Sequence, residues 1–235
     1  MKLYSNKIIV GFMAIIITIS LTNCKAVQNS NNKQKGAVIG AAGGAILGAI
    51  IGNNVGKGGN GELGAVIGGV VGGAAGIIIG NKMDKQAQEI ENEIPGAVVE
   101  RVDDGIVVTF DENSGVYFNT DKYNINSASQ NTLNKLAGVF KEYPDTNILV
   151  VGHTDSVGSE DYNMTLSKNR AYAVSDYLTS VGINNGRLTT NWFGESQPMH
   201  DNSTAEGRAK NRRVNVAILP NQQMIEEAKQ EAQKN

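Results

Sequence analysis

An arginine on the apolar stripe of a predicted helix constrains this chain more than any other feature. Arg170 belongs to a four-residue repeat whose other members are all apolar, namely Leu166, Val174 and Leu178. Side chains at this spacing share one helix face, so the face is expected to lie against a core. An unpaired charge there would be very costly, so Arg170 must meet an anion. Asp155, which follows the apolar strand predicted at 147–151, is the natural candidate.

Two interpretations of the Asp155 and Arg170 pair remain open from the residues alone. The pair can be a structural ion pair, which is the usual fate of a buried arginine. It can also hold a zwitterion, in which Asp155 accepts from an ammonium and Arg170 forms two parallel hydrogen bonds to a carboxylate.

The residues around this pair form a longer pattern. Residues 154–178 read Thr-Asp, ten residues, then Leu-Ser-x-x-Arg-Ala-x-x-Val-x-x-x-Leu, and residues 207–214 read Gly-Arg-Ala-Lys-Asn-Arg-Arg-Val. This pattern resembles the peptidoglycan-associating domain of the OmpA-like family, over about residues 98–219. The resemblance implies a domain that binds the diaminopimelate of the peptidoglycan stem peptide, with Asp155 and Arg170 carrying the binding.

The resemblance also implies a polar loop after the first core strand, which here is Phe118-Asn119-Thr120-Asp121-Lys122. The family often has Asp where this chain has Asn119. The full set of expected peptidoglycan-binding residues is Asp155, Arg170, Thr154, Asn119, Thr120 and Asp121.

Alternating strand and helix patterns predict the fold of this C-terminal part. Residues 98–110 read as a β-hairpin around Asp-Gly, and residues 127–130 as a capping box before a helix that Pro144 ends. Further strands are expected at 148–151, 188–193 and 214–219. We therefore expect an α/β (α+β) OmpA-like sandwich, a mixed sheet with helices on one face.

The N-terminal residues resemble a bacterial lipoprotein signal. Two lysines, an apolar run over residues 8–19 and a lone Cys24 follow one another in the expected order. The resemblance implies that Cys24 becomes the lipidated first residue; an uncleaved membrane anchor is the alternative. Loss of the two lysines would take the formal net charge from −2 to about −4, which offers no electrostatic basis for nucleic-acid binding.

A repeated glycine pattern precedes the predicted domain. Glycines fall at 36, 40, 44, 48 and 52 and again at 64, 68, 72, 76 and 80, and neither stretch carries a charge. Spacing by four aligns the glycines on one helix face and lets two backbones approach closely. We expect a glycine-zipper helical hairpin. Membrane insertion, soluble zipper packing and a segment without fixed structure are its three alternatives.

Residue types for catalysis and metal binding are poorly represented. The chain has two histidines and one cysteine, too few for a zinc site, and it lacks a Gly-x-Ser-x-Gly elbow. We therefore expect no catalytic residues, no metal and no cofactor. His153 is expected to pack at a strand end, and Gly152 and Gly158 to serve turns. Residues 211–213 are either part of a glycan or peptide surface or a solvated or sheet-edge basic pair.

The sequence predicts an envelope lipoprotein, not an enzyme, that binds peptidoglycan non-covalently and tethers the outer membrane to the cell wall. It would face the periplasm, held by lipid on Cys24 and, in one alternative, by residues 36–80. Zipper-driven membrane assembly or a pore-like role, with self-association, is the rival function. The expected divisions are a signal peptide (1–23), a tether (24–35), the hairpin (36–82), the domain (95–220) and a polar tail with little apolar surface (221–235).

Overall fold

The computed structural model describes residues 73–102, 104–111, 114–118 and 121–234, which include the whole predicted domain apart from three short gaps. The predicted signal peptide, tether and first glycine repeat lie outside the described residues. The elements follow in the order α4 (Gly73–Glu93), β1 (Val98–Val102), β2 (Gly105–Phe110), α5 (Ser127–Glu142), β3 (Thr146–Gly152), α6 (Glu160–Ser180), η1 (Asn185–Arg187), β4 (Leu188–Trp192), α7 (Ala205–Asn211), β5 (Val214–Pro220) and α8 (Gln222–Ala232).

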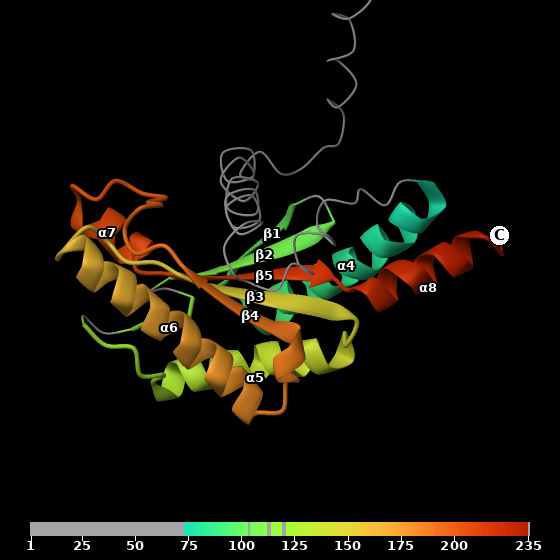
Figure 1. Ribbon diagram of the computed structural model, residues 1–235, viewed down its shortest axis with the longest axis horizontal. Helices are drawn as coiled ribbons and strands as arrows, with labels where there is room; N and C mark the ends of the chain where they lie inside the picture. The colour runs from blue at the N-terminus through green and yellow to red at the C-terminus, as the bar shows by residue number, and fades with distance from the viewer. Residues whose placement is uncertain (1–72, 103, 112–113, 119–120, 235) are drawn as a thin grey trace, which may run out of the picture. The chain divides into compact units, whose positions relative to one another are not determined.

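Five strands form one mixed sheet in the order β1-β2-β5-β3-β4 (Figure 1). The β3–β4 pair is parallel, and the other three pairs are antiparallel. The last strand, β5, enters between β2 and β3, so the segment preceding it lies beside the end of β3. This topology brings residues about 60 positions apart, around 155 and 212, together beyond one end of the central strands β3 and β5.

Helices α4, α5, α6 and α8 pack against one face of the sheet and make the main core with it. Figure 1 shows α5 and α6 lying together along this face. The predicted stripe of α6 is buried as expected, because Leu166, Arg170, Val174 and Leu178 are all at most 7% exposed. The predicted mixed sheet with helices on one face is confirmed.

The predicted element boundaries hold closely, with one correction at the start of α5. The N-cap is Asn126, whose side chain accepts a hydrogen bond from the Ser129 amide at 2.8 Å. The capping box predicted at 127–130 is therefore one residue out of register. Asn is as strong an N-cap as Ser, and here its amide group also donates to the carbonyl of Tyr117.

The C-terminal segment departs from the sequence-based expectation. It forms α8, which packs beside α4, and it buries Met224, Ile225 and Ala228 in the main core (Figure 1). The expectation that this tail offers little apolar surface is wrong. Three apolar residues at helical spacing suffice to make a narrow buried face when a partner helix is already in place. The division of the chain into domains stays a prediction.

Helix α4 supplies that partner, and it includes the end of the second glycine repeat. Ala75, Ile79 and Met83 belong to the main core, with Ile79 and Met83 fully buried. A Cβ placed at Gly80 would meet no atom within 4 Å, so this glycine does not mark a close backbone approach. Among the described helices, none combines the length and apolar composition that crossing a bilayer requires.

Candidate functional site

Asp155 lies in the turn between β3 and α6, three residues beyond the strand, as its sequence position predicted. Its carboxylate Oδ2 accepts a hydrogen bond from Nη1 of Arg212 at 2.8 Å. The other oxygen, Oδ1, accepts from the amide of Val157 at 3.1 Å. Both oxygens therefore have donors, and the carboxylate is held in one orientation.

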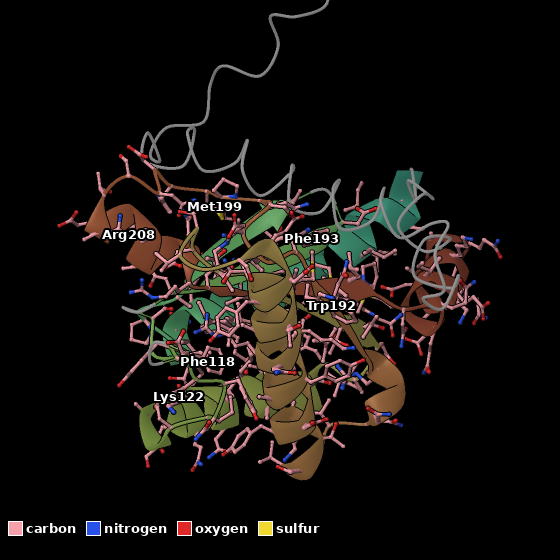
Figure 2. All side chains as sticks on the ribbon, turned by 60° about the vertical axis from the view of Figure 1, so that its left-hand side comes forward. Phe118, Lys122, Trp192, Phe193, Met199 and Arg208 are labelled. Atoms are coloured by element: carbon pink, nitrogen blue, oxygen red, sulfur yellow. The ribbon has the colours of Figure 1, made fainter. Side chains whose placement is uncertain are left out.

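Arg170 points from α6 into the interior and is 1% exposed. Its Nε donates to the carbonyl of Lys122 at 3.1 Å, and its guanidinium carbon lies 5.1 Å from the centre of the Phe118 ring. Figure 2 shows Phe118 and Lys122 together on one side of α6, with Trp192 on the other. The loop after β2 thus positions Arg170 through one carbonyl and one aromatic face.

The two arginines and the carboxylate form one electrostatic unit. Burial lowers the pKa of Arg170 to about 10, and the positive charge of nearby Arg212 adds to this decrease. Asp155 opposes the decrease, because its negative charge favours the charged guanidinium. Asp155 therefore has Arg212 in direct contact and Arg170 near enough for the two charges to interact. The sequence predicted Asp155 and Arg170 but left Arg212 as one of several basic residues.

The polar loop contributes Asp121 to the same region. Its carboxylate Oδ1 accepts from the hydroxyl of Tyr162 at 2.9 Å, which ties the loop to the first turn of α6. Asp121 has a φ of 58°, a left-handed conformation in which Asp is enriched. The other two predicted loop contacts, Asn119 and Thr120, lie outside the described residues. The structure brings Asp121, Asp155 and Arg170 to one site, and their role in binding stays a prediction.

Thr154 is buried beside Asp155 but supports the backbone. Its amide donates to the carbonyl of Gly194 at 2.9 Å, and its hydroxyl has no hydrogen-bond partner among the described residues. The neighbouring Asn163 donates to the Asp155 carbonyl at 3.3 Å and to the Glu195 carboxylate. Together these contacts join the start of α6 to the loop after β4.

Gly152 serves close packing, not the turn that the sequence suggested. A Cβ at this position would lie 2.1 Å from the backbone carbonyl oxygen of Ser167 in α6. The Ser167 hydroxyl in turn accepts from the Gly194 amide at 2.9 Å. By contrast, Gly158 has a φ of 110° and does serve the turn before α6, as expected. The glycine at 152 lets α6 lie close enough to β3 for Asp155 and Arg170 to be neighbours.

Residues 211–213 have three separate roles. Asn211 is fully buried and accepts from the amides of Met199 and His200, so it fixes the preceding loop. Arg212 reaches Asp155. Arg213 is 2% exposed and donates to Asn215 Oδ1 at 3.1 Å and to the Gln197 carbonyl at 3.0 Å. Asn211 and Arg213 are therefore neither solvated nor available to a ligand.

His153 packs at the end of β3, as predicted. It is fully buried, its ring stacks on Phe193 at 5.8 Å, and both ring nitrogens have no hydrogen-bond partner among the described residues. Burial lowers its pKa well below the usual value, and the nearby charge of Arg213 lowers it further. The ring is therefore neutral at pH 7 and acts as an apolar packing group.

One cavity of about 240 Å³ lies beside this region, lined by Glu160, Met164, Phe193, Gly194, Glu195 and Ser196. It does not include Asp155, Arg170 or Arg212, so it is not the predicted site. Within the described part of the chain, no cluster of three or more His, Cys, Asp or Glu side chains could hold a metal ion.

Comparisons with known families match two parts of the chain. Residues 117–212 match the OmpA family, and residues 1–84 match a YMGG-like Gly-zipper. The OmpA-like resemblance and the glycine zipper expected from the sequence are confirmed. The OmpA match spans Asp155, Arg170 and Arg212, and it supports the expectation that the chain is not an enzyme.

Several curated relatives share the C-terminal part. The chain is 39% identical to the "Probable lipoprotein YiaD" of Escherichia coli over 140 residues, which are 59% of this chain and 63% of that protein. It is 46% identical to outer membrane porin F of Pseudomonas aeruginosa over 44% of this chain and 30% of the porin. It is 38% identical to the peptidoglycan-binding protein ArfA of Mycobacterium bovis, over 44% and 32% of the two chains. The matches thus span less than two thirds of each relative.

Solved structures share the fold. A MotB-like protein from Desulfovibrio vulgaris has a TM-score of 0.52 and 26% identity, covering 62% of this chain and 91% of that one. The cell wall anchor of the T6SS from Pseudomonas aeruginosa has a TM-score of 0.50 and 28% identity, covering 59% and 96%.

Proposed function

We propose that this chain, whose residues 117–212 form an OmpA-family domain, is an envelope lipoprotein that binds peptidoglycan non-covalently and tethers the outer membrane to the cell wall. Relatives that share the domain support this proposal. One is named a peptidoglycan-binding protein, one a probable lipoprotein and one an outer membrane porin. A structure with the same fold is a cell wall anchor.

The ligand would be the diaminopimelate of the stem peptide, whose free end carries an ammonium and a carboxylate on one carbon. The observation that carries this assignment is the position of Asp155, which Arg212 contacts directly and whose charge acts on Arg170. A ligand carboxylate placed near both guanidiniums would reduce the repulsion between them and gain charge-assisted hydrogen bonds. Asp155 would accept from the ligand ammonium.

The arrangement favours a zwitterion over a simple anion. A simple anion would gain the attraction of the two arginines but would meet the repulsion of Asp155 and Asp121. A ligand that carries both charges avoids that repulsion, because its ammonium faces the carboxylates. The rigid placement of Asp155 by Val157 and Arg212 lowers the ordering cost of binding.

Sedimentation of the protein with purified sacculi tests the binding site. Asp155→Asn removes a charge while keeping the size of the side chain, and Arg170→Gln removes a charge with a shorter polar side chain. Each should weaken binding by about 1.5–3 kcal/mol, roughly 10- to 150-fold, because a charge-assisted contact is lost. Asp176→Asn, on the exposed face of the same helix α6, is the matched control and should pellet like the unchanged protein.

Two further measurements make this test decisive. Circular dichroism must show that the variants are folded, since Arg170 is buried in the core. Free meso-diaminopimelate should compete with sacculi, whereas Nα-acetyl-lysine amide, which has an ammonium but no carboxylate, should compete much less. Folded variants that pellet normally, or equal competition by the blocked lysine, would remove the proposed ligand.

Attachment to the membrane would come from lipid on Cys24, the only cysteine of the chain. Cys24→Ala should transfer the protein from the membrane fraction to the carbonate-extractable fraction, since the acyl chains supply the insertion energy. Retention of this variant in the membrane would indicate a second anchor, either the uncleaved residues 1–23 or residues 36–80. Deletion of residues 36–72 in the same variant separates the two.

The Gly-zipper match favours one alternative, in which the protein drives a membrane assembly or a pore and wall binding is secondary. Chemical cross-linking in the envelope separates the two functions. An assembly protein should give ladders of oligomers that vanish when residues 36–72 are deleted. A tether should give no such ladder and should keep its binding to sacculi after the deletion.

A further inference from the structure

The second face of the sheet carries a layer of apolar residues that the four core helices do not touch. It consists of Val107, Leu149, Val151, Ala217 and Leu219, called here the outer face. All five are at most 3% exposed. The described side chains that pack against them are Val102, Phe193 and Met199, which are themselves only partly buried.

An antiparallel sheet that leaves one face in water normally alternates apolar and polar residues along each strand. Strands β3 and β5 do not alternate in this way. Residues 148–151 and 216–219 are apolar at every position, so both faces of these central strands are apolar. Strands with this composition are covered on both sides. The outer face therefore needs a covering element of its own.

We propose that the glycine-repeat segment 40–72 covers the outer face of its own domain. The first support is continuity of packing. The last part of the same repeat, residues 73–80, forms the beginning of α4, and its Ala75 and Ile79 are already buried in the domain core. The segment that directly precedes Gly73 is thus attached to a helix that already packs in the domain core.

Composition gives the second support. Residues 36–52 and 64–80 carry no charge and consist mainly of Gly, Ala, Val and Ile. The five outer-face residues are also uncharged, so they leave no ion without a partner under an apolar cover. A charged neighbour on this side of the sheet is Glu100, which pairs with Val107; burial already raises the pKa of its carboxyl group, so a cover would favour its neutral form. Glycine at every fourth position gives a smooth helix face that can lie close to a sheet of Val, Leu and Ala side chains.

Size and tethering give the third support. A 17-residue helix is about 25 Å long. Five strands at their usual spacing span about 19 Å, so one repeat is long enough to cross the sheet. Covalent attachment to α4 gives the segment an effective concentration in the millimolar range, which a second copy of the chain does not match. The segment would then lie against its own domain and would not enter the bilayer.

Photo-cross-linking in the full chain, in its native envelope, tests this proposal. Thr189 pairs with Leu149, so it lies on the outer face. The adjacent Thr190 pairs with Val150, so it lies on the helix-covered face. Both threonines are half-buried. p-Benzoylphenylalanine at position 189 should form adducts with peptides from residues 40–72 of the same chain. The same probe at position 190, the matched control, should form adducts with α6 peptides and none with 40–72.

The other occupants of the outer face give distinguishable results. Adducts between two chains would identify a second copy, and adducts with lipid would identify the bilayer; either result overturns the proposal. Adducts of position 189 confined to other parts of the chain would also overturn it. None of these results depends on wall binding, so the proposal and the function of the Asp155 site are tested separately.

Carbene footprinting gives an independent measurement in the same protein. Deletion of residues 40–72 should raise the labelling of Leu149 and Leu219 several-fold. The labelling of Ile148 and Ile218, which belong to the same strands but face the helices, should stay unchanged. Equal labelling of Leu149 and Leu219 with and without the segment would overturn the proposal.

Discussion

Arg212 donates from Nη1 to Oδ2 of Asp155 over 2.8 Å, although 57 positions separate the two residues in the chain. The contact depends on the insertion of β5 between β2 and β3, because Arg212 is the C-cap of α7 just before β5 and Asp155 follows β3. The sheet order thus converts two distant chain segments into one charged site.

Loss of this contact should weaken both the site and the fold. In Arg212→Gln, Asp155 keeps the Val157 amide but loses its charged donor. We expect destabilisation of about 1–3 kcal/mol by chemical denaturation and at least about tenfold weaker binding to sacculi. Lys210→Gln, an exposed residue on the same helix α7, should change neither quantity. Normal binding by a folded Arg212→Gln protein would exclude Arg212 from the site.

Gly152 should be irreplaceable because of the close approach of α6. In Gly152→Ala, the added methyl group would meet the Ser167 carbonyl oxygen at 2.1 Å, and neither backbone can move without disturbing the core. We expect a loss of about 3 kcal/mol in the free energy of unfolding. Gly138→Ala in α5, where a Cβ meets no atom within 4 Å, should instead stabilise the protein by about 0.5–1 kcal/mol. Equal effects at the two glycines would contradict the packing argument.

His153 should make the stability of the protein depend on pH. The folded protein keeps the ring neutral because burial lowers its pKa, whereas the unfolded chain protonates it near pH 6.5. Below that pH the unfolded state binds more protons, so stability should fall with decreasing pH by up to about 1.4 kcal/mol per unit. Denaturation curves between pH 5 and pH 7.5 should show this slope.

His153→Leu should remove most of that slope, because the variant has no proton to bind at this position. It should also not lower stability at pH 7 by more than a small amount, since the ring nitrogens form no hydrogen bond with a described residue. His200→Gln, at the more exposed of the two histidines, is the comparison. Burial and the charges of Lys210 and Arg213 also lower the pKa of His200, but less than that of His153, so this variant should lose a smaller part of the slope. An identical slope in His153→Leu would place the titrating group elsewhere.

The packing of α8 on α4 should contribute measurably to stability. Ile225 is 6% exposed in the core, so Ile225→Ala should lower the free energy of unfolding by about 2 kcal/mol. Gln223→Ala, on the exposed side of the same helix, should be nearly neutral. If both substitutions behave alike, α8 is not docked in solution.

The sequence was sufficient for the features that depend on local spacing. The four-residue repeat around Arg170 predicted a buried helix stripe, and the alternation of strand and helix patterns predicted a mixed sheet with helices on one face. The pattern of Thr154-Asp155, the α6 stripe and residues 207–214 predicted the match of residues 117–212 to the OmpA family. These features depend on periodicity and residue type, which any single segment displays by itself.

Only the tertiary structure decided which distant groups meet. Residues 211–213 are three adjacent polar residues, yet one fixes a loop, one reaches Asp155 and one is buried beside His153. The apolar face of α8 appears only when α4 is beside it, and Gly152 is needed because of a carbonyl fifteen residues away in α6. Such contacts are set by strand order and helix packing, which one segment's sequence does not specify because each depends on the position of another.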